Sequence, residues 1–147
     1  QTSSHVAILN EMNHDVRIVP LDGRAALPSS LRQWAGVSRG RWEGDTLVVE
    51  TTNFHPRQLL RGASDSLRVV ERFTRVDERT ILYRFTVHDP STFTQPWSGQ
   101  LPFVAMDDLV HEYACHEGNY ALSNILSGAR AQEREAARRK PAQPTKP

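Results

Sequence analysis

The chain has 147 residues, enough for one domain with its own hydrophobic core and too few for two of ordinary size. Lys and Arg number 18 against 17 Asp and Glu, a net charge of +1, so no overall electrostatic field draws the protein to nucleic acid. The single cysteine excludes an internal disulfide, and no apolar run is long enough to span a membrane.

The first part of the chain has the pattern of a β-hairpin. Residues 5–12 (HVAILNEM) and 15–20 (DVRIVP) are strand-like runs, and the Asn-His pair between them marks the turn. The connection that follows contains turn residues such as Gly23 and Pro28 and shows no regular period. We therefore expect an irregular segment up to about Trp34.

The clearest local signal in the chain is the stretch GRWEGDTLVVETTNF, residues 40–54. Strand-like runs at residues 39–43 and 46–52 flank the pair Gly44-Asp45. A Gly-Asp pair between two such runs is typical of a tight antiparallel turn. The stretch therefore predicts a second hairpin.

Four further strand-like runs follow, at residues 67–75, 80–88, 97–104 and 109–115. In the first of them Glu71 shares a face with Leu67, Val69 and Phe73, because alternate side chains of a strand point the same way. The second has the most regular apolar stripe, formed by Ile81, Tyr83, Phe85 and Val87. Pro102 in the third favours an edge position or a bulge.

The last part of the chain changes to a helical period. Apolar residues recur at helical spacing from Tyr120 to Leu126, and Asn119 is a suitable N-cap. Residues 129–140 are rich in charged helix formers, and residues 141–147 have the composition of a disordered tail. Gly128 is a candidate break in the helix.

The predicted fold is mainly β, with about eight antiparallel strands in meander order followed by a C-terminal helix. A sheet of that size tends to curl, and closure removes its exposed edges. An eight-stranded barrel is therefore the first interpretation, and a strongly curved open sheet is the alternative. We expect residues 1–128 to form the β domain with the start of the helix, and residues 129–147 to form a charged helix and tail.

The densest polar cluster is HEYACHEGNY, residues 111–120. A helical zinc site needs two histidines four positions apart, whereas His111 and His116 are five apart. On a strand the two would point to opposite faces. We expect no metal here, and the absence of a phosphate-binding loop or dinucleotide fingerprint leads us to expect no cofactor.

A cavity built from several strands is the better candidate site. Glu71 and Tyr83 are predicted to face the same interior, and His111 or Glu117 could join them from the last strand. A carboxylate there needs a cationic or hydrogen-bonding partner, and it would suit a general base or a ligand anchor. The alternative is that Glu71 pairs with a neighbouring arginine as part of a structural network.

Four ordered motifs resemble the C-terminal part of an uncharacterised family of secreted bacterial proteins: GRWEGDTLVVETTNF, VVERFTRVD, ILYRFTVHDPSTFTQPW and HEYACHEGNY. The resemblance covers the chain up to about residue 130. It implies an exported, secreted or periplasmic protein whose longer relatives carry a signal peptide and an additional N-terminal region. It supplies no catalytic residues.

These observations leave three hypotheses open. The first is a secreted or periplasmic β domain that binds a small molecule through Glu71, Tyr83, Trp42, Trp97 and His111. The second is a cofactor-independent hydrolase or isomerase, with Glu71 or Glu117 as base beside His111. The third is an interaction module of a larger exported protein, in which residues 5–12 or the charged helix contact the additional N-terminal region.

Overall fold

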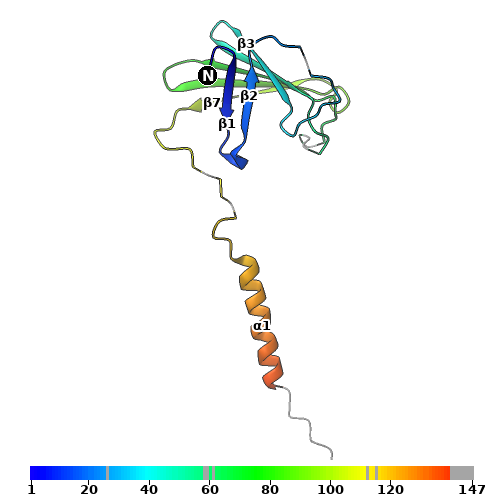
Figure 1. Cartoon of the computed structure of the whole chain (residues 1–147), viewed down its shortest axis with the longest axis vertical. Coiled ribbons are helices and arrows are strands. Elements are labelled where there is room, and N and C mark those ends of the chain that lie inside the picture. Colours follow the sequence, from blue (N-terminus) through cyan, green and yellow to red (C-terminus); the bar gives the residue numbers. More distant parts are fainter. Residues whose placement is uncertain (26, 58–59, 61, 112, 115, 140–147) are drawn as a thin grey trace, which may run out of the picture. The chain divides into compact units, whose positions relative to one another are not determined.

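The computed structural model describes residues 1–25, 27–57, 60, 62–111, 113–114 and 116–139. The chain divides into two compact units, residues 1–112 and residues 113–147. Figure 1 shows the strands in the first unit and the helix, α1 (Ala121–Arg139), in the second. The boundary expected after residue 128 lies inside α1, which continues through Gly128.

Within the described residues, the first unit contains seven strands in two antiparallel sheets. They are β1 (His5–Leu9), β2 (Val16–Pro20), β3 (Val37–Glu43), β4 (Thr46–Thr52), β5 (Arg68–Arg75), β6 (Thr80–His88) and β7 (Trp97–Val104). A short 3₁₀ helix, η1 (Met12–His14), joins β1 to β2 in a hairpin, and β3 to β7 form a five-stranded meander. The predicted antiparallel, mainly β architecture with a C-terminal helix is confirmed.

The predicted closure into a barrel is not confirmed. Across the described residues the larger sheet runs β3-β4-β5-β6-β7, and no ladder joins its two edge strands. The eighth strand expected at residues 109–115 is absent where this segment is described, since residues 109–111 and 113–114 are irregular. An alternating pattern suits a strand, but a strand forms only where a neighbour completes its backbone hydrogen bonds.

The central hairpin forms as its turn residues predict. Gly44 has a φ of 58°, in the left-handed region that tight hairpin turns need and that glycine adopts without steric cost. The register pairs Glu43 with Thr46 on either side of this turn, and Trp42 with Leu47. Every second residue of β3 and β4 therefore shares a face.

The β1–β2 hairpin packs against one face of the five-stranded sheet, here called the inner face, and in Figure 1 it lies in front of that sheet. Val19 of β2 is fully buried against Leu47 and Val49 of β4. The approach is close at Gly40 of β3, where a Cβ atom would lie 2.7 Å from Cγ1 of Val19. Any larger residue at position 40 would push the hairpin away from the sheet.

The opposite, outer face of the sheet is polar. One row crosses all five strands, from Arg41 on β3 through Val48, Arg72 and Arg84 to Gln100 on β7. Arg72 and Arg84 are direct neighbours, and both Arg41 and Arg72 form ion pairs with Glu43. The outer face therefore carries more positive than negative side chains in this row.

The second unit is dominated by α1. The side-chain oxygen Oδ1 of Asn119 accepts a hydrogen bond from the backbone N–H of Ala121 at 3.0 Å, so the predicted N-cap residue caps the helix. Leu122, Ile125 and Leu126 form an exposed apolar stripe, and α1 buries none of its residues. No described helix combines the length and apolar character that crossing a membrane requires.

Candidate functional site

Glu71 of β5 lies on the inner face, where it forms a two-pronged ion pair with Arg17 of β2. Nη1 of Arg17 donates to Oε2 of Glu71 at 2.6 Å, and Nη2 donates to Oε1 at 3.1 Å. The side chain of Glu71 is 8% exposed and that of Arg17 is 20% exposed. The pair therefore fastens the β1–β2 hairpin to the sheet with charge-assisted hydrogen bonds.

Tyr83 of β6 completes this polar cluster, because its hydroxyl donates to Oε1 of Glu71 at 2.9 Å. Burial raises the pKa of Tyr83, and the negative charge of Glu71 raises it further, so the phenol remains a hydrogen-bond donor across the neutral range. Both oxygens of Glu71 are thus bonded to donors from the protein. The sequence left two roles open for Glu71, a structural network with an arginine and a general base. This arrangement fits the structural network better, because a general base must be able to accept a proton from substrate.

An aromatic layer surrounds Tyr83 on the inner face. Its ring centroid lies 5.0 Å from that of Phe73 and 4.9 Å from that of Phe103, with the second pair stacked. Phe85 continues the layer and meets Trp97 edge-on at 5.6 Å. Such ring pairs stabilise beyond the area they bury.

An apolar groove of about 530 Å³ runs between β1 and the inner face of the sheet. It is lined by Val6, Ala7, Ile8 and Leu9 of β1 and by Trp42, Leu47, Phe73, Ile81 and Phe103 of the sheet. Its polar rim is formed by Gln1, Asn10, Asp45 and Arg75. The groove exists because the two-stranded hairpin is narrower than the five-stranded sheet beneath it.

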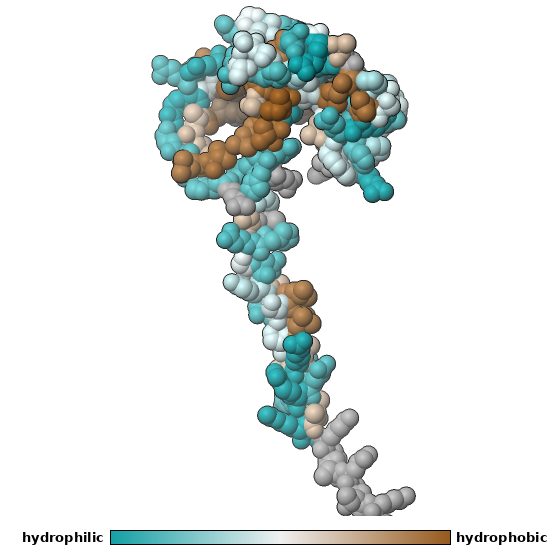
Figure 2. Space-filling model, in the orientation of Figure 1, coloured by the Kyte–Doolittle hydropathy of each residue, from teal (hydrophilic) through white to brown (hydrophobic). Residues whose placement is uncertain are grey.

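Large side chains of this groove remain open to solvent: Trp42 is 46% exposed, Ile81 39% and Phe103 42%. Figure 2 shows apolar side chains gathered at the surface of the first unit, over the β1–β2 hairpin. Contiguous apolar surface of this kind marks interaction sites in soluble proteins. Trp42, a predicted ligand contact, therefore lies in this apolar groove.

The other predicted contacts are distributed differently. Trp97 lies at the far end of the aromatic layer and does not line the apolar groove. His111 lies in another hollow, beside Leu9 and His14, and its Nε2 is 3.7 Å from the carboxylate of Asp108. Of the expected inner-face cluster in the first unit, only Glu71 and Tyr83 are in contact.

Glu117 belongs to the second unit, where its backbone N–H donates to the carbonyl of Ala114 in a turn. Two members of the same segment, Glu112 and Cys115, lie outside the described residues. Over the part of the chain that is described, no group of three or more His, Cys, Asp or Glu side chains is placed to hold a metal ion.

Arg17 is the member of the cluster that the sequence did not indicate. On β2, Arg17 and Val19 face the sheet, whereas Val16 and Ile18 are exposed. A hydropathy pattern would place Val16 and Ile18 against the sheet and Arg17 in solvent, because the two aliphatic residues flank the arginine. The only available signal was the buried carboxylate predicted at Glu71, which requires a cation from somewhere in the fold.

Asp89, directly after β6, acts as a cap and is almost fully buried. Its carboxylate accepts hydrogen bonds from the backbone N–H of Ser64 at 2.5 Å and from the Ser64 hydroxyl at 2.6 Å. Burial acts to raise the pKa of Asp89, but the hydrogen bonds from Ser64, Thr92 and Ser91 outweigh it and the pKa lies below its ordinary value. Asp89 thus ties the loop before β5 to the end of β6.

The comparisons with known proteins identify no relative. No family model, no curated protein and no solved structure matches the chain.

Proposed function

We propose that this protein is a non-catalytic binding domain that holds a small, elongated apolar molecule in the apolar groove. The observation that carries the proposal is the groove itself, where Trp42, Ile81 and Phe103 stay exposed on the face that packs against the β1–β2 hairpin. The four motifs that resemble secreted bacterial proteins support export as part of the proposal, and a periplasmic or secreted domain would meet its ligand there.

The size and lining of the groove suit such a ligand. Its volume of about 530 Å³ falls within the range of small-molecule sites, which are mostly apolar with a few polar groups at fixed positions. Covering the exposed parts of Trp42, Ile81 and Phe103 gains roughly 25 cal/mol for each Å² of apolar surface removed from water. The polar rim at Asp45 and Arg75 favours a molecule with one polar end.

Glu71 has a supporting part in this proposal. Its ion pair with Arg17 holds β1 over the sheet, and β1 forms one wall of the groove. The aromatic layer behind Phe73 and Phe103 gives the other wall a rigid surface. Binding therefore requires the hairpin to remain docked.

Titration with the apolar fluorescent probe 1-anilinonaphthalene-8-sulfonate tests the proposal. Phe103→Ala removes a wall of the groove, whereas Leu101→Ala removes a similarly exposed inner-face side chain that does not line it. We expect the first variant to weaken probe binding by roughly tenfold, as loss of an aromatic contact of about 1.4 kcal/mol implies, and the second to leave it unchanged.

A blocking variant supplies the complementary test. Ile81→Trp puts a larger ring on the sheet wall of the groove and should exclude the probe without removing a buried residue, since Ile81 is 39% exposed. Equal binding by wild type, Ile81→Trp and Phe103→Ala would refute the proposal. So would probe binding that disappears equally in Leu101→Ala.

A further inference from the structure

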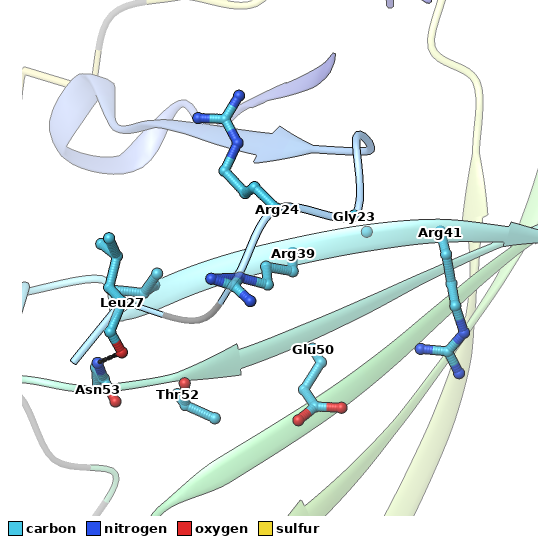
Figure 3. Close-up of a pocket in the computed structure, with 10 residues that line it drawn as sticks. Gly23, Arg24, Leu27, Arg39, Arg41, Glu50, Thr52 and Asn53 are labelled. Atoms are coloured by element: carbon cyan, nitrogen blue, oxygen red, sulfur yellow. Dashed lines mark hydrogen bonds between the residues drawn. The ribbon is translucent and has the colours of Figure 1, made fainter. Parts of the chain in front are cut away.

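A second hollow of about 340 Å³ lies on the outer face of the sheet, beside β3 and β4. Figure 3 shows its lining, which comes from the outward side chains of these strands and from the loop that precedes them. The lining residues are Gly23, Arg24, Leu27, Val37, Arg39, Gly40, Arg41, Glu50, Thr52 and Asn53. Because strand side chains alternate, this outer pocket and the apolar groove use opposite faces of the sheet.

Arg39 is the unusual member of the outer pocket. It is half-buried, and its Nη2 donates to the backbone carbonyl of Ala25. Among the described residues no carboxylate lies within ion-pair distance of Arg39, although Glu50 is its direct neighbour on β4. Glu50 instead pairs with Arg68 at 3.4 Å.

The other two arginines of the outer pocket already have carboxylate partners. Arg24 pairs with Asp22, and in Figure 3 its guanidinium points away from Arg39. Arg41 pairs with Glu43 at 2.6 Å. Of the arginines that line the outer pocket, Arg39 is therefore the one without a carboxylate partner among the described residues, and its guanidinium keeps further N–H donors in the fork geometry that matches a carboxylate.

The remaining polar groups narrow the class of ligand. The carboxylate of Glu50 lines the same hollow, and even with Arg68 at 3.4 Å it disfavours a multiply charged anion, whereas it accepts hydrogen bonds from hydroxyl groups. Thr52 adds a hydroxyl, and Asn53 is fixed in place because its Nδ2 donates to the carbonyls of Leu27, Pro28 and Leu31. This set suits a ligand with one carboxylate and several hydroxyls.

We propose that the outer pocket binds a small hydroxylated monocarboxylate of the sugar-acid class, with its carboxylate on Arg39 and its hydroxyls on Glu50 and Thr52. The volume of about 340 Å³ is at the lower end of the range for small-molecule sites and matches a ligand of monosaccharide size. The inference is independent of the apolar groove, since the two sites share no charged residue.

Calorimetric titration of the full chain with D-glucuronate, D-glucose and inorganic phosphate tests the assignment. We expect D-glucuronate to bind at millimolar concentration and to bind about tenfold more tightly than either of the other two, because only it satisfies both Arg39 and Glu50. Absence of D-glucuronate binding, equal binding of D-glucose or tighter binding of phosphate would overturn the assignment.

Variants locate the site. Arg39→Gln should weaken D-glucuronate binding by about tenfold or more, and Arg39→Lys, which keeps the charge but loses the fork, should give an intermediate loss. Arg84→Gln is the matched control, because Arg84 lies on the outer face but outside the pocket, with its Nε on Gln100. An equal loss in the control, or no loss in either Arg39 variant, would overturn the proposal.

Glu50→Gln tests which class of ligand the outer pocket accepts, whereas the Arg39 variants test where the ligand binds. It is informative even if the Arg39 variants fail to fold. Removing this carboxylate should raise the affinity of the outer pocket for inorganic phosphate severalfold, since the repulsion of a second negative charge is gone. Unchanged phosphate affinity in a folded Glu50→Gln protein would show that Glu50 does not select against dianions and would refute the monocarboxylate assignment.

Discussion

Replacing Glu71 with glutamine should destabilise the first unit strongly. The amide has nearly the same shape as the carboxylate, but it removes the charge that Arg17 faces across 2.6 Å and leaves a largely buried guanidinium without its anion. The Nε atom of Arg17 is already buried without a hydrogen-bond partner among the described residues, so the cation has few alternatives. Breaking a buried pair from one side costs about 3 kcal/mol or more.

This cost translates into a large change in melting temperature. A unit of 112 residues has an unfolding entropy of about 0.24 kcal/mol/K, so a loss of about 3 kcal/mol lowers the midpoint by roughly 12 °C. Thermal unfolding followed by circular dichroism measures the shift. A Glu71→Gln protein that melts within about 2 °C of wild type would refute the ion pair and would favour a solvent-filled cavity around Glu71.

Two further variants separate the charge effect from the loss of contacts. Tyr83→Phe removes one hydrogen bond to the carboxylate but keeps the ion pair, so we expect a smaller loss of about 1.5 kcal/mol. The double variant Arg17→Leu with Glu71→Leu leaves no buried charge, and it should recover much of the stability that Glu71→Gln loses. A double variant less stable than Glu71→Gln would contradict the claim that the unpaired cation is what costs stability.

Two other predictions follow from the geometry. Gly99→Val should destabilise by about 2 kcal/mol or more in urea unfolding, because a Cβ atom at this position would lie 2.6 Å from the ring of Phe85; wild-type stability would contradict the tight packing of the aromatic layer. Asp89, with its pKa held below the ordinary value of an aspartate, stabilises the fold at pH values above that ordinary pKa and loses this contribution as the pH falls through its lowered pKa. The stability of wild type should therefore approach that of Asp89→Asn in acid, and parallel pH profiles for the two proteins would disprove this.

Local patterns in the sequence were sufficient to predict much of the secondary structure. The strands at residues 46–52, 80–88 and 97–104 were predicted with the bounds that the structure shows, because alternation and turn residues act over a few neighbours. The turn at Gly44 and the N-cap at Asn119 were predicted from the same kind of local chemistry. Pro102 indicated either an edge position or a bulge, and β7 is an edge strand of the sheet.

The same local patterns gave wrong or unconfirmed predictions where a strand needs a partner strand from elsewhere in the chain. Alternation at residues 109–115 predicted a strand, but the described residues there have no partner strand. Sheet closure was likewise predicted from the number of strands alone, and the pairing of the described residues does not confirm it. Whether a strand forms, and whether a sheet closes, depends on backbone partners that lie far away in the sequence.

The candidate site shows most clearly what the sequence determines and what the tertiary structure determines. Sequence alone placed Glu71 and Tyr83 on one face, because strand periodicity fixes which side chains point together. Only the tertiary structure decided what covers that face, since Arg17 lies 54 residues away on a hairpin whose docking leaves Val16 and Ile18 exposed. Periodicity is a property of one strand, whereas an ion pair and a groove require two elements packed in a particular register, and that packing is set by the balance of burial and charge over the whole unit.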